Sequence, residues 1–135
     1  MDLLKLSEKY YDEMLQLLHD ICVIPAPSGL EDERAEFVLK YLKDLGIENA
    51  HIDEAKNVVC TLGEPSDDMS VFMAHTDIVF PADVPLNYVD DGEKIHCPGV
   101  IDDVACLVIM LLCVKHIVTE GVKLNRTIMF VANSC

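Results

Sequence analysis

Two strongly apolar segments separated by a helical pattern constrain the fold of this chain most. Residues 70–74 and 126–132 have the composition of buried strands, and residues 103–120 between them form a long apolar helical pattern that ends at Gly121. A strand, a helix and a second apolar strand form a crossover that places both strands parallel in one sheet. The sequence therefore predicts an α/β layered fold, with a mostly parallel mixed sheet flanked by helices.

Two helices are expected before the first strand. Apolar residues recur at helical spacing over residues 3–22. A break rich in proline follows, and Ser28 or Gly29 can start a second helix, with acidic residues in its first turn that suit the helix dipole. Gly46 provides a stop for that helix.

The pattern then changes to that of short strands. Residues 47–52 and 57–62 are predicted strands, and residues 78–98 have no strong period and are predicted to form an ordered loop. A loop of this length inside a compact domain is more often functional than idle. The final strand, residues 126–132, is apolar enough to be buried on both faces.

Composition narrows the class of protein. A chain of 135 residues that is 51% hydrophobic is expected to fold as one domain, and its net charge of -14 argues against nucleic acid or an anionic membrane as a partner. The start lacks a secretory signal, and the apolar run 104–114 is too short to cross a bilayer. We therefore expect a cytoplasmic protein whose six cysteines, which show no C-x-x-C spacing, stay reduced.

Acid and imidazole groups at a strand end indicate a metal site. The strand 70–74 runs directly into His75 and, two residues later, Asp77, which project to the same side of an extended chain. A neutral imidazole and carboxylate oxygens together suit zinc. His75 is the expected metal ligand, and Asp77 is expected to accept a hydrogen bond from its other ring nitrogen or to lie just behind it. Asp102 follows a Pro98-Gly99 turn, and its two carboxylate oxygens make it the better candidate to bridge two cations.

Structural roles for the same residues remain open. A single H-x-D at a strand end is common, and Asp102 with Asp103 could simply cap the helix that begins there. His96 is first a loop residue and only second a substrate contact. The other three histidines are assigned to helix or strand surfaces: His19, His51 and His116.

The two motifs in this order resemble the peptidase T–aminoacylase family of co-catalytic zinc hydrolases. The strand ends in Ala74-His75-Thr76-Asp77, and Pro98-Gly99-Val100-Ile101-Asp102-Asp103 follows. The resemblance covers almost the whole chain and includes the two leading helices. It implies that residues 1–135 are the N-terminal portion of one catalytic domain, without the small inserted domain or the C-terminal half.

The resemblance also implies roles for particular residues. His75 would bind one zinc ion, Asp77 would orient His75 as a catalytic residue, and Asp102 would bridge two zinc ions. The peptide bond between Asp102 and Asp103 would be cis. In that family a glutamate pair after the next strand supplies the general base and a further ligand, and no such pair follows that strand in this sequence. The chain departs from the family pattern at Val104, where lysine is frequent, and at Cys106, where glycine is common.

The function implied by the resemblance is hydrolysis of peptide bonds in short peptides, with an activated water held by two zinc ions. Members include aminopeptidases, dipeptidases and carboxypeptidases, and the substrate within the family stays open. A deacylase of N-acyl amino acids and a non-catalytic binding module that keeps the fold are the alternatives. With two expected ligands, the chain alone is expected to bind zinc weakly, to be inactive, and to self-associate through exposed core surface.

Overall fold

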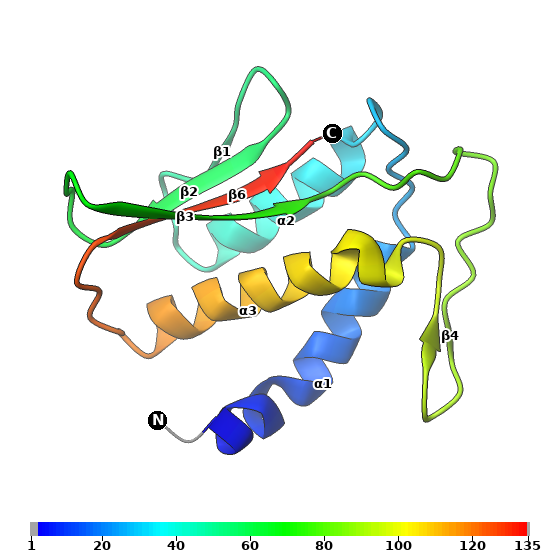
Figure 1. The fold of residues 1–135 in the computed structure, drawn as a ribbon, viewed down its shortest axis with the longest axis horizontal. Helices are drawn as coiled ribbons and strands as arrows, with labels where there is room; N and C mark the ends of the chain where they lie inside the picture. Colours follow the sequence, from blue (N-terminus) through cyan, green and yellow to red (C-terminus); the bar gives the residue numbers. More distant parts are fainter. Residues whose placement is uncertain (1–2, 135) are drawn as a thin grey trace.

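The computed structural model describes residues 3–134 of the chain (Figure 1), and Cys135, expected at the tip of the last strand, lies outside this part. The elements follow one another as α1 (Leu3–Cys22), α2 (Asp32–Asp44), β1 (His51–Ile52), β2 (Val58–Leu62), β3 (Met69–His75), β4 (Val89–Asp90), β5 (Ile95–His96), a π-helical turn η1 (Val100–Val104), α3 (Ala105–Thr119) and β6 (Thr127–Asn133). No helix in residues 3–134 has both the length and the apolar character needed to cross a membrane.

The predicted α/β fold with a mixed sheet is confirmed. Four strands form one sheet in the order β1-β2-β6-β3, and the predicted crossover places β3 and β6 side by side and parallel, with His75 opposite Asn133. The other two pairings are antiparallel, so the expectation of a mostly parallel sheet is wrong for these strands. The crossover rule concerns only β3, α3 and β6, and no local pattern encodes the direction in which β2 joins β6.

One hydrophobic core holds the helices against a single face of the sheet. Alternate strand residues point into it, as expected for a pleat with a period of two. These residues are Val58, Cys60, Ala74, Phe130 and Ala132. All three helices contribute to the same core, and Figure 1 shows α1 and α3 on one side of the sheet. The opposite face therefore stays uncovered along β3, where Val71 and Met73 are 51% and 61% exposed.

Two strand predictions need correction. In the segment 47–52 only His51–Ile52 pairs with a strand, because Ile47 and Ala50 pack into the core without pairing. The final strand was expected to be buried on both faces, and this is confirmed in part, since on the face away from the helices Thr127 and Val131 are buried and Met129 is only partly buried. The loop 78–98 also contains a short hairpin of β4 and β5.

The second helix begins later than expected. Ser28 and Gly29 belong to a turn in which the Leu30 amide donates to the Pro27 carbonyl at 2.8 Å, and Gly29 has a φ of 88°. The helix α2 starts at Asp32 and ends before Gly46, as predicted. Ser28 is thereby left free to make a contact far away in the sequence.

Candidate functional site

The parallel pair β3 and β6 positions the first candidate residue. β3 ends at His75, and beyond it the Thr76 amide donates to the Asn133 carbonyl at 2.8 Å, which extends the contact with β6 by one step. His75 thus lies at the carboxyl end of a parallel strand, the edge of a sheet at which ligands usually bind in α/β folds. Asn133 lies beside it in the register, so the two strand ends that were expected to meet do meet.

Asp77 lies against one nitrogen of the His75 ring. The Asp77 Oδ1 atom and the Asp77 carbonyl oxygen are each 3.0 Å from His75 Nδ1. Asp77 is buried, with 7% of its surface exposed, whereas the His75 side chain is about one-third exposed. This arrangement favours a proton on Nδ1 and leaves Nε2 turned toward the open side.

Asp102 reaches the other nitrogen of the same ring. Its Oδ1 atom is 3.1 Å from His75 Nε2, and its side chain is 78% exposed. The Asp102-Asp103 peptide bond is cis, as expected from the resemblance, and it lies inside η1. The structure therefore brings together the three predicted site residues, His75, Asp77 and Asp102.

A glycine turn allows η1 to approach the end of β3. Gly99 has a φ of 76°, and a Cβ atom at this position would stand 2.3 Å from Ile78 Cγ2. Any side chain at residue 99 would push the turn away from Ile78 and move the segment that carries Asp102. The expected helix start at Asp103 is also revised, because α3 begins at Ala105, after η1.

The carboxylates around His75 determine its charge. Partial burial alone would lower the pKa of His75, but the hydrogen bond to Asp102 and the charge of Asp77 outweigh it, and the pKa is raised. Asp103 adds to this field and also accepts a hydrogen bond from the His75 amide at 3.2 Å. Without a metal ion, the imidazolium form can donate to a carboxylate from each ring nitrogen.

The departure at Cys106 lies next to this cluster. A hydrogen bond with Asp103, followed by slight burial and the charges of Asp103 and Asp102, raises the pKa of the Cys106 thiol. The thiol form is therefore favoured. Val104, the other departure, is buried in the core and offers no polar atom to the site.

The donor atoms fit part of a zinc centre. His75 Nε2 and Asp102 Oδ1 converge, and an imidazole nitrogen with a carboxylate oxygen is a donor pair that zinc accepts. Within residues 3–134, however, no three side chains of His, Cys, Asp or Glu are grouped so that they could hold a metal ion. The described residues thus supply fewer donors than the three protein ligands typical of catalytic zinc sites.

Two residues around the site were missed by the sequence analysis. Ser28 Oγ donates to Asp77 Oδ2 at 2.5 Å, and Arg34, which is fully buried, donates from Nη1 to the Thr76 carbonyl at 2.7 Å. Both contacts join the first helical region to the segment after β3. The only signal in the sequence was a basic residue among the apolar positions of α2 and a serine in the break rich in proline.

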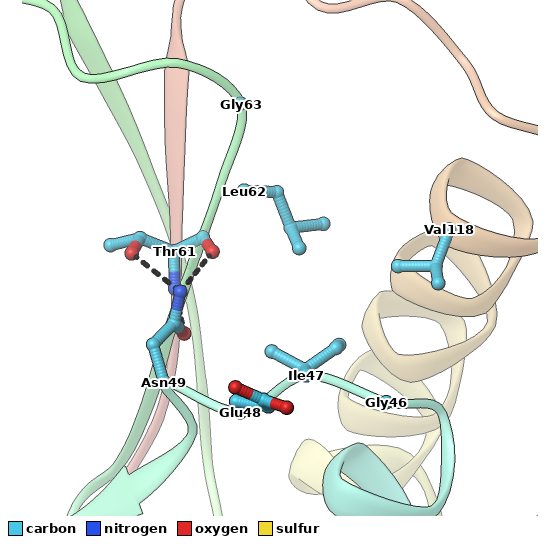
Figure 2. A pocket seen from close by; sticks show the side chains of 8 residues that line it. All are labelled: Gly46, Ile47, Glu48, Asn49, Thr61, Leu62, Gly63 and Val118. Carbon is cyan, nitrogen blue, oxygen red and sulfur yellow. Dashed lines mark hydrogen bonds between the residues drawn. The ribbon is translucent and has the colours of Figure 1, made fainter.

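A surface hollow lies beside Leu62, the last residue of β2 (Figure 2). Leu62 pairs with Ile128, and Ile128 pairs with Ser70 near the start of β3. The hollow is therefore at the end of the sheet opposite to His75. Asn49 lines it and donates from Nδ2 to the Thr61 carbonyl at 2.8 Å. Glu48 is the one charged residue among those that line it. The hollow is separate from the cluster around His75.

A family model matches the part of the chain that carries the candidate site. The sequence model described as Peptidase family M20/M25/M40 matches residues 71–135, which include His75, Asp77 and Asp102. A sequence search of curated proteins gives no match.

Solved structures share the fold over most of this chain. Aminopeptidase PepT from Bacillus cereus is 21% identical, with a TM-score of 0.74, over 91% of this chain and 36% of its own. Human carnosine dipeptidase 1 is 17% identical, with a TM-score of 0.77, over 94% of this chain and 32% of its own. The YXEP protein of Bacillus subtilis, described as a dinuclear metal binding peptidase, is 14% identical, with a TM-score of 0.66, over 95% of this chain and 36% of its own.

The chain spans about a third of the length of these three structures. At these identities the likeness shows a shared fold, and the family match adds the sequence relationship for residues 71–135, which carry the site. The resemblance found in the sequence is thereby confirmed, and residues 71–135 carry the sequence pattern of Peptidase family M20/M25/M40.

Proposed function

We propose that this chain is the N-terminal portion of the catalytic domain of a metal-dependent hydrolase that cleaves peptide bonds in short peptides. The observation that carries the proposal is the convergence of His75 Nε2 and Asp102 Oδ1 at 3.1 Å, with Asp77 against the opposite ring nitrogen. The family match over this region and the peptidases that share the fold support the same class of reaction.

Each of the three residues has a separate task in this proposal. His75 would offer Nε2 to one metal ion, and Asp102, with two oxygens on an exposed side chain, would be the residue able to hold two ions. The Asp77 carbonyl oxygen accepts a hydrogen bond from Nδ1, and the nearby carboxylate favours the same proton position, so that the lone pair stays on Nε2. The YXEP protein, a dinuclear metal binding peptidase of the same fold, supports a pair of ions, and the donor types favour zinc.

Bound zinc would activate a water molecule and polarise the scissile carbonyl. The substrate we propose is a short peptide, and the PepT and carnosine dipeptidase structures support this choice. N-acyl amino acids are the alternative, since the same chemistry cleaves both amide bonds. The cytoplasmic location and the preference for a chain end or an internal bond stay predictions from the sequence.

The chain alone is proposed to be inactive. His75 and Asp102 are two donors, and residues 3–134 supply no third one grouped with them, so the remaining ligands and the general base would come from residues outside this sequence. Hydrolysis of a dipeptide by the purified chain, lost in Asp102→Ala, would contradict this part of the proposal.

Zinc titration by calorimetry tests the site. Three proteins are compared: the unchanged chain, Asp102→Ala and, as a matched control, Asp67→Ala, which removes an exposed aspartate from the turn before β3. We expect weak binding to the unchanged chain and to the control, and a loss of roughly tenfold or more in the Asp102 variant. Equal affinity in all three proteins would contradict the assignment of Asp102.

A further inference from the structure

The carboxylate of Asp77 is held from two sides. Its Oδ1 atom lies 3.0 Å from His75 Nδ1, and its Oδ2 atom accepts the hydrogen bond from Ser28 Oγ at 2.5 Å. Both oxygens of this buried carboxylate therefore have a partner. The result is a continuous chain of contacts from Ser28 through Asp77 and the His75 ring to Asp102.

The segment that carries Ser28 is fixed next to Asp77 by separate contacts. Arg34 donates from Nη2 to the Ile24 carbonyl and from Nη1 to the Thr76 carbonyl, so one buried guanidinium joins the two segments. The Ile78 amide donates to the Ala26 carbonyl at 2.8 Å, on the other side of Asp77. Residues 24–28 are thus aligned with residues 76–78, and the Ser28 hydroxyl faces the carboxylate.

Two other serines of the described residues bond only locally. Ser7 Oγ donates to the Leu4 carbonyl and Ser66 Oγ accepts from the Asp68 amide, both within three residues, as is usual for serines in turns and helices. Ser28 instead bonds a side chain 49 positions away, whereas Ser134, which also has a distant partner, donates to the backbone carbonyl of Ala55. The alternative role of Ser28, starting the second helix, is excluded because α2 begins at Asp32.

We propose that Ser28 is a positioning residue that acts on His75 through the carboxylate of Asp77. By occupying Oδ2, the hydroxyl stops the carboxylate from rotating and keeps Oδ1 directed at His75 Nδ1. With Oδ1 held there, the carboxylate reinforces the Asp77 carbonyl oxygen, the other acceptor 3.0 Å from Nδ1, so that the proton of the neutral ring stays on Nδ1 and the Nε2 lone pair is available to a metal ion. This role rests on the proposed function, because a fixed Nε2 lone pair serves the chemistry only when His75 binds a metal ion.

The test is the tautomer of His75, measured from the ring nitrogen shifts of the isotopically labelled, metal-free chain at a pH where the ring is neutral. Asp102→Ala is the parent, because it removes the competing acceptor at Nε2. Ser28→Ala, Ser28→Thr and the control Ser66→Ala are each added to it. His75→Gln assigns the signals.

We expect the parent to hold the proton on Nδ1 and the Ser28→Ala variant to weaken this preference, with only the Asp77 carbonyl left as a fixed acceptor and both nitrogen shifts moving toward those of a tautomer mixture. Ser28→Thr keeps the hydroxyl and should restore the parent shifts, and Ser66→Ala should leave them unchanged. An unaltered tautomer in Ser28→Ala would overturn the proposal, and so would unfolding of this variant, which would make Ser28 a purely structural residue. Loss of the zinc site in calorimetry would count against the proposed function alone, because the tautomer is measured without metal.

Discussion

Arg34 and Thr76 are joined by a buried hydrogen bond, in which Nη1 donates to the carbonyl oxygen at 2.7 Å. The same guanidinium also donates to the Ile24 carbonyl, so a single side chain holds the segment after β3 against the segment before α2. A lysine at position 34 could not make both contacts in the same way, since it offers one point charge and not a planar fork of donors.

Replacement of Arg34 by methionine is therefore expected to destabilise the fold. The carbonyl groups of Thr76 and Ile24 would lose a charged donor in a buried place, which costs about 1–3 kcal/mol for each unsatisfied group, or about 2–6 kcal/mol in total. Urea unfolding measures the loss. Arg126→Met is the control, because Arg126 forms an exposed ion pair with Asp68 at 3.2 Å, for which about 0–1 kcal/mol is expected. Equal losses in both variants would show that the Arg34 contacts contribute little.

Alanine at Gly99 should disturb both stability and the site. The left-handed backbone alone costs about 1–2 kcal/mol for a residue with a Cβ atom, and the approach to Ile78 Cγ2 at 2.3 Å adds a clash. Gly92→Ala separates the two effects, because Gly92 has a φ of 88° and no atom within 4 Å of the added Cβ. We expect a larger fall in the midpoint of urea unfolding for Gly99→Ala than for Gly92→Ala. Similar midpoints would mean that the turn moves without cost.

Asp53 should make part of the stability depend on pH. Hydrogen bonds from the Asn57 side chain, and then from the Asn57 and Ala55 amides, hold the pKa of Asp53 below its usual range. Because the pKa in the folded state is the lower one, the stabilisation is fully present above the pKa of the unfolded chain. It is lost as the pH falls through the pKa of the folded state.

Urea unfolding of the unchanged chain and of Asp53→Asn, followed from pH 7 to about pH 3, measures this effect. The difference in the free energy of unfolding between the two proteins should shrink toward acid. Asp67→Asn, which makes the same change at an exposed residue of another turn, is measured beside it as the matched control. A constant difference for Asp53→Asn would contradict the assigned hydrogen bonds.

The uncovered face of the sheet is expected to drive self-association. Val71 and Met73 project from it on the edge strand β3, and Met69–Ala74 contain no charged residue. In sedimentation velocity, Met73→Lys should shift the chain toward the monomer. Val79→Lys, which makes a matching change at an exposed residue after β3, should leave the distribution unchanged. A monomeric unchanged chain would rule the proposal out.

Local patterns predicted the parts of the fold that depend on neighbouring residues. The helix over residues 3–22 and the crossover from β3 to β6 were predicted because both follow from periodicity over a continuous segment. The hairpin of β4 and β5 was missed, although Asp91 and Gly92 between Val89 and Ile95 are a recognisable turn signal.

The residues of the candidate site could also be predicted only where local sequence identifies them. His75, Asp77 and Asp102 could be named from residue type and from their place at element ends, and the structure brings them together. The contact between Ser28 and Asp77 could not be predicted, because it joins residues 49 positions apart through a turn whose path depends on Arg34. The pairing of β2 with β6 is equally non-local.

The place of β6 in the sheet has a consequence for how the molecule assembles. β2 and β3 follow each other in the sequence, yet β6 lies between them and makes every hydrogen-bonded pair that either of them has on that side. Among the described residues β3 pairs only with β6, so its apolar side chains stay exposed until residues 127–133 have been synthesised. Insertion of β6 is then the step that closes the sheet, and, because it joins segments about 60 residues apart, it should limit the folding rate.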